Sequence, residues 1–322
     1  MKRSTYAATV LLLGWSLVVY AGDLRAMAYT PGTKEAAQAW QIEVRAGLFD
    51  ALHMRDLVAQ DAPPIPFDTE KTGYGPCDGY RMLEIRFRST PTRFIDACLA
   101  IPDQPEGKLP AVVCVHGHGG DRFTAFDPEA AIYKQFGAAL ARRGYVVISI
   151  DVGQHEVYEE GRTLMGERLW DLMRCVDYLA AMDRVDARRI GCAGLSLGGE
   201  MTMWLGAMDT RVAATSSCGF LTLMDQMEQN HCMCWKFDGL RERVDFPDIY
   251  ALVAPRALQC QNGRKEPETQ FNIGLAEVAF DQVLPIYRDM EAGGEAELVI
   301  HDGGHEIAIE SLTRFFDEHL AP

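Results

Sequence analysis

The sequence predicts an α/β fold with a mostly parallel central sheet, helices on both faces and an antiparallel N-terminal edge. Two observations lead to this prediction. From residue 109 onwards, short apolar runs typical of strands buried on both faces alternate with amphipathic stretches of helical length. Before residue 109, two segments alternate apolar and polar side chains, as half-exposed antiparallel strands do. A chain of 322 residues can bury one large core, so we expect a single main domain.

The first 21 residues read as a secretory signal peptide. Lys2 and Arg3 precede an apolar run at 7–19, and Val19-Tyr-Ala21 offers a small-residue cleavage site. The run is shorter than the roughly 20 residues of a comfortable membrane span. We therefore expect export to the periplasm or the medium without stable membrane insertion after cleavage, and an uncleaved anchor is the alternative.

Residues 22–79 are expected to form a helical extension that packs on the core. Apolar side chains recur at helical spacing over 34–60, and the pattern stops before Ala62-Pro-Pro-Ile-Pro66. The main domain then spans 80–322 and opens with antiparallel strands near 83–88 and 94–101.

The remaining elements follow in alternation, which predicts parallel strands joined by helices. The expected strands are 109–115, 146–150, 190–193, 212–216, 254–260 and 297–300, and the expected helices are 130–142, 167–182, 200–208 and a terminal one near 312–320. Residues 217–250 are a possible lid or pocket-wall insertion. Its larger side chains could line a substrate site or simply pack on the body, and they are Phe220, Met224, Met227, His231, Trp235 and Phe237.

The pentapeptide Gly194-Leu-Ser-Leu-Gly198 follows an apolar run and precedes a helix-compatible stretch. A sharp turn from strand to helix exposes a serine hydroxyl and aims the next backbone N–H at the substrate. Glycines suit the flanking positions because side chains there would crowd the turn. The pattern therefore predicts Ser196 as a nucleophile and the Leu197 N–H as an oxyanion donor.

A second glycine loop, His116-Gly-His-Gly-Gly-Asp121, follows the strand at 109–115. Loops of this type supply the other N–H of an oxyanion hole. The position after the first His-Gly is His118, so its backbone N–H is assigned to that role.

The general base and the acid should follow the nucleophile, in the order serine, acid, histidine. His305 ends the loop His301-Asp-Gly-Gly-His305, and its glycines allow it to approach Ser196, whereas His301 lies at a strand end and His319 on the terminal helix. Glu266 follows the strand at 254–260 and is the preferred acid, with Glu268 as its rival. Asp151 precedes Ser196, so it is interpreted as a loop-organising residue, with His155 and Glu156 as possible pocket residues.

Several of these motifs together resemble an α/β-hydrolase, in the branch of dienelactone hydrolases and acetyl xylan esterases. They are His116-Gly-His-Gly-Gly120, 143–151, 186–191, Gly194-Leu-Ser-Leu-Gly-Gly199, Ala254-Pro-Arg256, Asn262-Gly263 and Gly303-Gly-His305. The resemblance implies ester or lactone hydrolysis through an acyl-enzyme. Glu266 stands where the family pattern has aspartate. Serine stands where dienelactone hydrolases have cysteine, which favours ordinary esters, with a carbohydrate-type ester as substrate.

The formal charge of −15 argues against nucleic acid or an anionic membrane as a partner. Serine chemistry requires no metal or organic cofactor, so none is expected. Two alternatives stay open. A metal-dependent hydrolase could use His116, His118, His301 and His305, since His-x-His is a frequent zinc element. A protein could also keep the fold for binding alone.

Nine cysteines leave at least one thiol unpaired. Cys114, Cys192 and Cys260 fall in expected buried strands, where cysteine packs as a small hydrophobe. His231-Cys-Met-Cys234 places three soft ligands together, but no second Cys/His pair follows at zinc-finger spacing. Packing, or a local disulfide elsewhere, is therefore favoured over a structural zinc.

Overall fold

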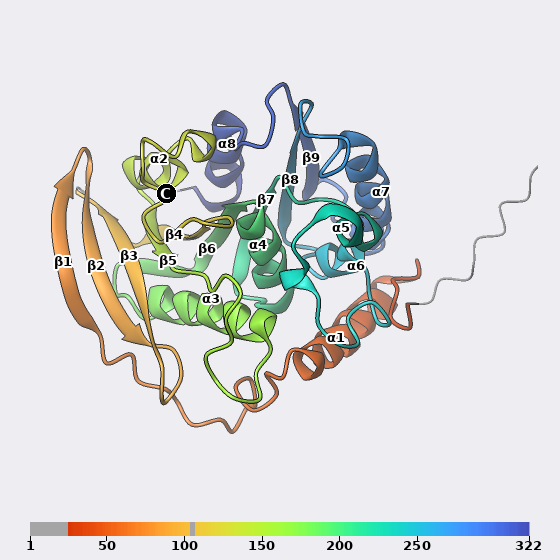
Figure 1. Ribbon diagram of the computed structural model, residues 1–322, viewed down its shortest axis with the longest axis horizontal. Coiled ribbons are helices and arrows are strands. Elements are labelled where there is room, and N and C mark those ends of the chain that lie inside the picture. The colour runs from red at the N-terminus through yellow and green to blue at the C-terminus, as the bar shows by residue number, and fades with distance from the viewer. Residues whose placement is uncertain (1–24, 104–106, 322) are drawn as a thin grey trace, which may run out of the picture.

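The computed structural model describes residues 25–103 and 107–321, so the expected signal peptide at 1–21 lies outside the described residues. The described strands join into one sheet of nine in the order β1-β2-β3-β5-β4-β6-β7-β8-β9 (Figure 1). The strands are β1 (Glu70–Cys77), β2 (Tyr80–Arg88), β3 (Phe94–Pro102), β4 (Leu109–Val115), β5 (Val146–Ile150), β6 (Val185–Leu195), β7 (Val212–Cys218), β8 (Ala257–Gly263) and β9 (Ala296–His301).

The sheet is antiparallel at its N-terminal edge and parallel elsewhere, as expected. β1, β2, β3 and β5 pair antiparallel, and the pairs from β5 through β4 to β9 are parallel. The sheet begins earlier than expected, because β1 pairs with β2 across a tight turn at Asp78 and Gly79. Residues 22–79 are therefore not wholly helical, and the boundary expected at residue 80 falls between two paired strands.

Helices cover both faces of the sheet (Figure 1). Two of them, α2 (Phe136–Arg142) and α8 (Ile309–Leu320), pack with each other on one face. The other face carries α1 (Lys34–Ala51), α3 (Leu164–Ala180), α4 (Leu197–Met208), α6 (Phe246–Ala251) and α7 (Ile273–Asp289). None of the helices within 25–103 and 107–321 has the length and apolar character needed to span a bilayer. The architecture is thus the α/β-hydrolase fold that the sequence predicted.

The first helix ends earlier than predicted, at Ala51 instead of near residue 60. His53 adopts a left-handed φ of 57°. The His53 N–H donates to the Asp50 carbonyl, and the Met54 N–H donates to the Phe49 carbonyl. These two bonds form a Schellman cap, which satisfies the last carbonyls and turns the chain away. Glycine usually fills the left-handed position, so a histidine there gives no stop signal in the sequence.

The helix expected at 130–142 is also interrupted. A 3₁₀ turn at Ala131–Tyr133 is followed by Lys134 and Gln135, whose φ values are 54° and 49°, before α2 begins. The interruption lets the buried Tyr133 hydroxyl accept a hydrogen bond of 2.8 Å from the Gly117 N–H. Helix α7 was not predicted, and the strand expected at 254–260 starts at Ala257, after the turn that holds Pro255.

Because the strands from β4 to β9 are parallel, their carboxyl ends lie along one edge of the sheet. The loops that begin at His116, Asp151, Ser196, Gly219, Arg264 and Asp302 all leave from this edge. Ligands of open α/β sheets bind outside the carboxyl ends of the strands. The fold therefore brings the loops of the predicted site together.

Candidate active site

Ser196 occupies a strained turn between β6 and α4. Its φ of 62° and ψ of −122° are rare for a residue other than glycine, and its N–H donates to the Cys218 carbonyl at 2.9 Å. The turn is tight because a Cβ at Gly198 would overlap the Val115 carbonyl oxygen of the neighbouring strand. This is the geometry of a nucleophile elbow, in which strain is retained to present the hydroxyl.

The buried side chain of His116 anchors the glycine loop to the loop after β5. Its ring is fully buried, and Nε2 accepts the Val152 N–H at 2.9 Å. The ring proton is therefore on Nδ1, which lies 2.7 Å from the Gly117 carbonyl oxygen. Burial lowers the pKa of His116 and keeps the ring neutral. His116 thus fixes the loops after β4 and β5 to each other.

The two backbone groups predicted to stabilise an oxyanion are those of His118 and Leu197. In the described part of the chain, neither N–H has a hydrogen-bond partner, whereas the next amide, Gly119, donates to Gln154 Oε1 at 3.0 Å. Leu197 is also the first residue of α4, where the helix dipole favours negative charge. Both residues line the same small pocket as Ser196.

His305 and Glu266 form a hydrogen-bonded pair. The His305 Nδ1 lies 3.0 and 3.1 Å from the two carboxylate oxygens of Glu266, so it donates to the carboxylate. The Glu266 side chain is 1% exposed and that of His305 is 29% exposed. Glu268, the rival acid, is exposed on the surface. The longer glutamate side chain is accommodated at this position.

Two backbone segments hold this pair in place. The Arg264 N–H donates to the His301 carbonyl at 2.8 Å and the Lys265 N–H to the Gly303 carbonyl at 2.9 Å. Glycine is required at residue 263, because a Cβ there would overlap the Gly304 carbonyl oxygen. The loops after β8 and β9 are therefore joined where they carry Glu266 and His305.

The imidazole of His305 lies beside the backbone next to Ser196. A Cβ at Gly219 would be 3.0 Å from His305 Cε1, and Gly219 directly follows Cys218, whose carbonyl accepts the Ser196 N–H. The ring of Phe271 also stacks on that of His305, with centroids 5.5 Å apart. The ring of His305 therefore lies between Phe271, which lines the same pocket as Ser196, and the backbone that follows β7.

The insertion at 217–250 forms a wall of the pocket beside Ser196. The pocket has a volume of about 20 Å³, and residues of the insertion that line it are Phe220, Met227, His231, Cys232, Cys234 and Trp235. Met224 and Phe237 pack against the main core and are not among the lining residues. Phe220, Met227 and Trp235 line the pocket and also belong to the main core, so the two alternatives for this segment do not exclude each other. Its short elements are α5 (Met224–Asn230), the 3₁₀ turn η2 (Met233–Trp235) and most of α6 (Phe246–Ala251).

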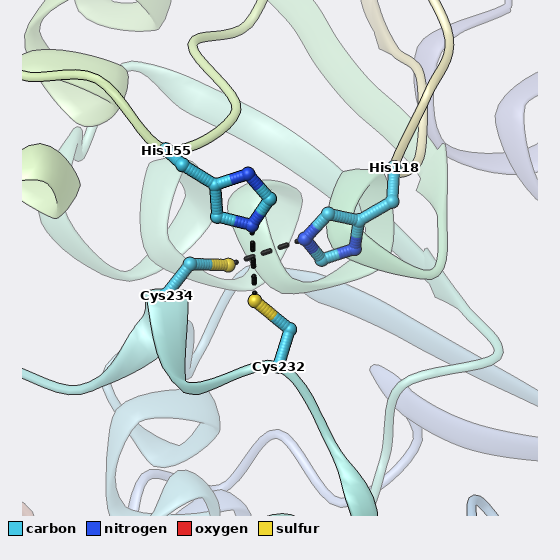
Figure 2. A group of neighbouring side chains, drawn as sticks. All are labelled: His118, His155, Cys232 and Cys234. Atoms are coloured by element: carbon cyan, nitrogen blue, oxygen red, sulfur yellow. Dashed lines mark hydrogen bonds between the residues drawn. The ribbon is translucent and has the colours of Figure 1, made fainter.

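The four histidines of the metallohydrolase alternative do not form one metal site. Both ring nitrogens of His116 are engaged in the core, and His301 Nδ1 accepts the Gly303 N–H at 3.2 Å beyond β9. Among the described residues, His118 instead gathers with His155, Cys232 and Cys234 (Figure 2). Sequence reasoning missed this group, because its members come from three distant segments without a shared motif.

Asp151 organises the loops as expected. Its carboxylate accepts the Arg122 backbone N–H at 2.7 Å and the Arg122 guanidinium at 2.6 Å, which ties the loops after β5 and β4 together. Glu156 lines a separate cavity of about 250 Å³ that does not include Ser196.

Glu200 is a further polar residue of the pocket, and no sequence motif pointed to it. It lies one helical turn after Ser196 in α4, is buried, and its Oε1 has no hydrogen-bond partner among the described residues. Burial raises the pKa of Glu200 to about 7, against a smaller opposing effect of the Arg168 charge. The carboxyl group is therefore largely protonated below neutral pH.

We expect Glu200→Gln to change the pH dependence of stability. The folded-state pKa lies above the unfolded value of 4.5, so the protonated group favours the folded state below pH 4.5 and this contribution is lost as pH rises to about 7. Across this window, the free energy of unfolding of the variant should rise by about 3 kcal/mol relative to that of the wild type. Urea unfolding at pH about 5 and about 8 measures it. An equal difference at both pH values would contradict the assignment.

The order of the sheet and the turn at Ser196 together place the protein in the class with the α/β-hydrolase fold. A model of the prolyl oligopeptidase family matches residues 133–253, a range that holds Ser196 but neither Glu266 nor His305. The chain is 29% identical over 178 residues to YtaP, a candidate hydrolase of Bacillus subtilis (strain 168). That match spans 48% of this chain and 60% of YtaP.

Solved structures extend the likeness over most of the chain. A candidate acetyl xylan esterase from Bacteroides fragilis NCTC 9343 superposes with a TM-score of 0.70 at 17% identity, covering 86% of this chain and 78% of the other. A glucuronoyl esterase from Solibacter usitatus superposes with a TM-score of 0.69 at 17% identity, covering 91% of this chain and 96% of the other. These similarities show the shared fold.

Proposed function

We propose that the protein is a serine-dependent carboxylic ester hydrolase that acts through an acyl-enzyme. The observation that carries the proposal is the hydrogen bond of 3.0 Å between His305 Nδ1 and the buried Glu266 carboxylate, with the His305 ring beside Gly219. Gly219 follows Cys218, whose carbonyl accepts the Ser196 N–H. A carboxylate bonded to Nδ1 leaves Nε2 unprotonated and able to act as a base. The esterase names of the structural relatives support the same reaction class.

In the proposed reaction, His305 Nε2 takes the Ser196 proton while Oγ attacks the ester carbonyl carbon. The tetrahedral intermediate then collapses, its C–O bond to the alcohol breaks, and the imidazolium gives its proton to the leaving alcohol. Water repeats the sequence on the acyl-enzyme and releases the acid. Glu266 holds the imidazole in one tautomer and stabilises the imidazolium without taking its proton.

We assign stabilisation of the negative charge on the substrate oxygen to the backbone N–H groups of His118 and Leu197. One donor belongs to the loop after β4, which the buried His116 ties to the loop after β5, and the other to the start of α4. We therefore expect little reorganisation during the reaction. Removing one donor of an oxyanion hole typically costs about 10²–10³ in rate.

The space beside Ser196 favours a short acyl group. A volume of about 20 Å³ is close to that of a site for a single water molecule, which suits a methyl group better than a long or cyclic acyl chain. We therefore assign acetyl esters of carbohydrates as the substrate class, in line with the acetyl xylan esterase name of one relative.

A substrate panel tests this assignment. Acetylated xylan and p-nitrophenyl acetate should be hydrolysed, with kcat/KM for p-nitrophenyl esters falling by about 10-fold or more from acetate to butyrate as the acyl group outgrows the pocket. A glucuronoyl ester should be a poor substrate. Faster hydrolysis of the butyrate or glucuronoyl ester would contradict the short-acyl assignment. Cleavage of a prolyl p-nitroanilide without any ester hydrolysis would replace the esterase by a peptidase.

A further inference from the structure

Four side chains that can ligate a metal converge beside the candidate site (Figure 2). His118 comes from the loop after β4, His155 from the loop after β5, and Cys232 and Cys234 from the insertion around η2. We propose that these four residues bind one Zn²⁺ ion, which fastens the insertion to the two loops beside Ser196. This inference is independent of the proposed esterase activity.

The spacing of the ligand atoms is close to that around one tetrahedral ion, which would require two of the pairs to move apart by a few tenths of an ångström. Zn–S bonds of about 2.3 Å and Zn–N bonds of about 2.0–2.1 Å place tetrahedral ligand atoms about 3.3–3.8 Å apart. Here His118 Nε2 lies 3.2 Å from Cys234 Sγ, and His155 Nε2 lies 3.0 Å from Cys232 Sγ. All four ligand atoms lie within 4.8 Å of one another. Both imidazoles present the same nitrogen, Nε2, to the group.

The donor chemistry selects zinc over the hard cations. Two thiolates and two imidazoles form a tetrahedral S₂N₂ set, which is characteristic of zinc, whereas calcium and magnesium require oxygen ligands. Two thiolates would also balance the charge of the ion. Because the protein fills all four coordination positions, the geometry points to a structural ion and leaves no open position for a reacting water.

The loops that carry the histidines are already held in place. The Arg168 guanidinium donates to the Gly153 carbonyl at 2.6 Å and also to the Gln154 carbonyl, and the Gly119 N–H donates to the Gln154 side chain at 3.0 Å. The rings of His118 and His155 stack with centroids 5.7 Å apart. Two of the four ligands are thus preorganised, and the ion would recruit the cysteines of the insertion.

Such an ion would act on the candidate site through His118. The imidazole of His118 would bind the metal, and the same residue lines the pocket that contains Ser196. Cys232 and Cys234 line the same pocket. The ion would therefore fix both the glycine loop and the pocket wall.

Metal content tests the proposal directly. The full chain is reduced, supplied with excess Zn²⁺, desalted and measured by mass spectrometry of the metal, with an expected ratio of about one zinc per chain. His155→Ala and Cys234→Ser should lose most of the bound zinc. His231→Ala and Cys77→Ser are matched controls from outside the group, and both should retain it.

Two further measurements apply if a ligand variant does not fold. Wild-type protein with Co²⁺ should show the intense visible absorption of a tetrahedral thiolate site, and zinc should protect two thiols from a thiol reagent. The inactive Ser196→Ala variant should still bind zinc, which separates this inference from the esterase proposal. A wild-type ratio close to zero after reduction, or zinc lost in His231→Ala but kept in His155→Ala, would overturn it.

Discussion

Ser196→Ala is expected to lower kcat for p-nitrophenyl acetate by about 10⁴–10⁶-fold. The substitution removes the atom that would form the acyl bond, and no other group can replace it in the elbow. Alanine retains the Cβ that Ser196 already holds at a φ of 62°, so the turn gains no new strain. The fold and the melting temperature should therefore be nearly unchanged, and initial rates with circular dichroism on the same preparation test both statements.

The Ser196→Ala result also separates the proposed enzyme from a binding protein of the same fold. Retained turnover in a folded variant would remove Ser196 from the mechanism. An inactive wild type that binds acetylated carbohydrate as well as the variant does would favour the binding role. A large fall in kcat with little change in KM supports the assignment, because the lost interaction acts only in the transition state.

Glu266→Gln should have the second largest effect, lowering kcat by about 10⁴-fold. The carboxylate accepts the proton of His305 Nδ1 at 3.0 Å, and a neutral amide can present its NH₂ group there and reverse the tautomer of the ring. The amide is close in size to the carboxylate, so packing around this buried side chain should be maintained.

Glu268→Gln is the matched control for Glu266→Gln. Glu268 lies two residues away on the same loop and is exposed, so we expect this variant to keep wild-type kcat. A pH–rate profile adds a readout that a purely structural role would not move, because the loss in Glu266→Gln should come with a changed pH dependence of kcat. Equal activities of the two variants would remove Glu266 from the triad.

Much of the fold could be predicted because buried parallel strands are continuous apolar runs. β4 and β5 were predicted with their observed bounds. The errors arise where local signals and tertiary contacts diverge. His53 caps α1 in a conformation that glycine usually takes, and helix α7 contains Pro285, which interrupts the helical pattern. The polar and glycine-rich β1, with two glycines and a proline, lacks a strand pattern of its own.

The residues of the candidate site also differ in how well the sequence predicts them. Ser196 and the glycine loop are recognisable because a short motif determines their local geometry, and His305 and Glu266 follow from chain order. The group of His118, His155, Cys232 and Cys234 depends on three segments that meet only in the folded chain. The sequence suggested His231 as the partner of the two cysteines, whereas its ring packs against Phe271 instead. Because these residues meet only in the folded protein, their separations in the sequence form no pattern that would predict the group.

The most direct test of the central claim is to locate the residue that an active-site-directed fluorophosphonate modifies. The reagent needs an activated serine, so the account predicts one adduct per chain on the peptide that contains Ser196, and strongly reduced labelling in Glu266→Gln. Labelling of a different residue, or none in protein that hydrolyses p-nitrophenyl acetate, would contradict the claim that His305 and Glu266 activate Ser196.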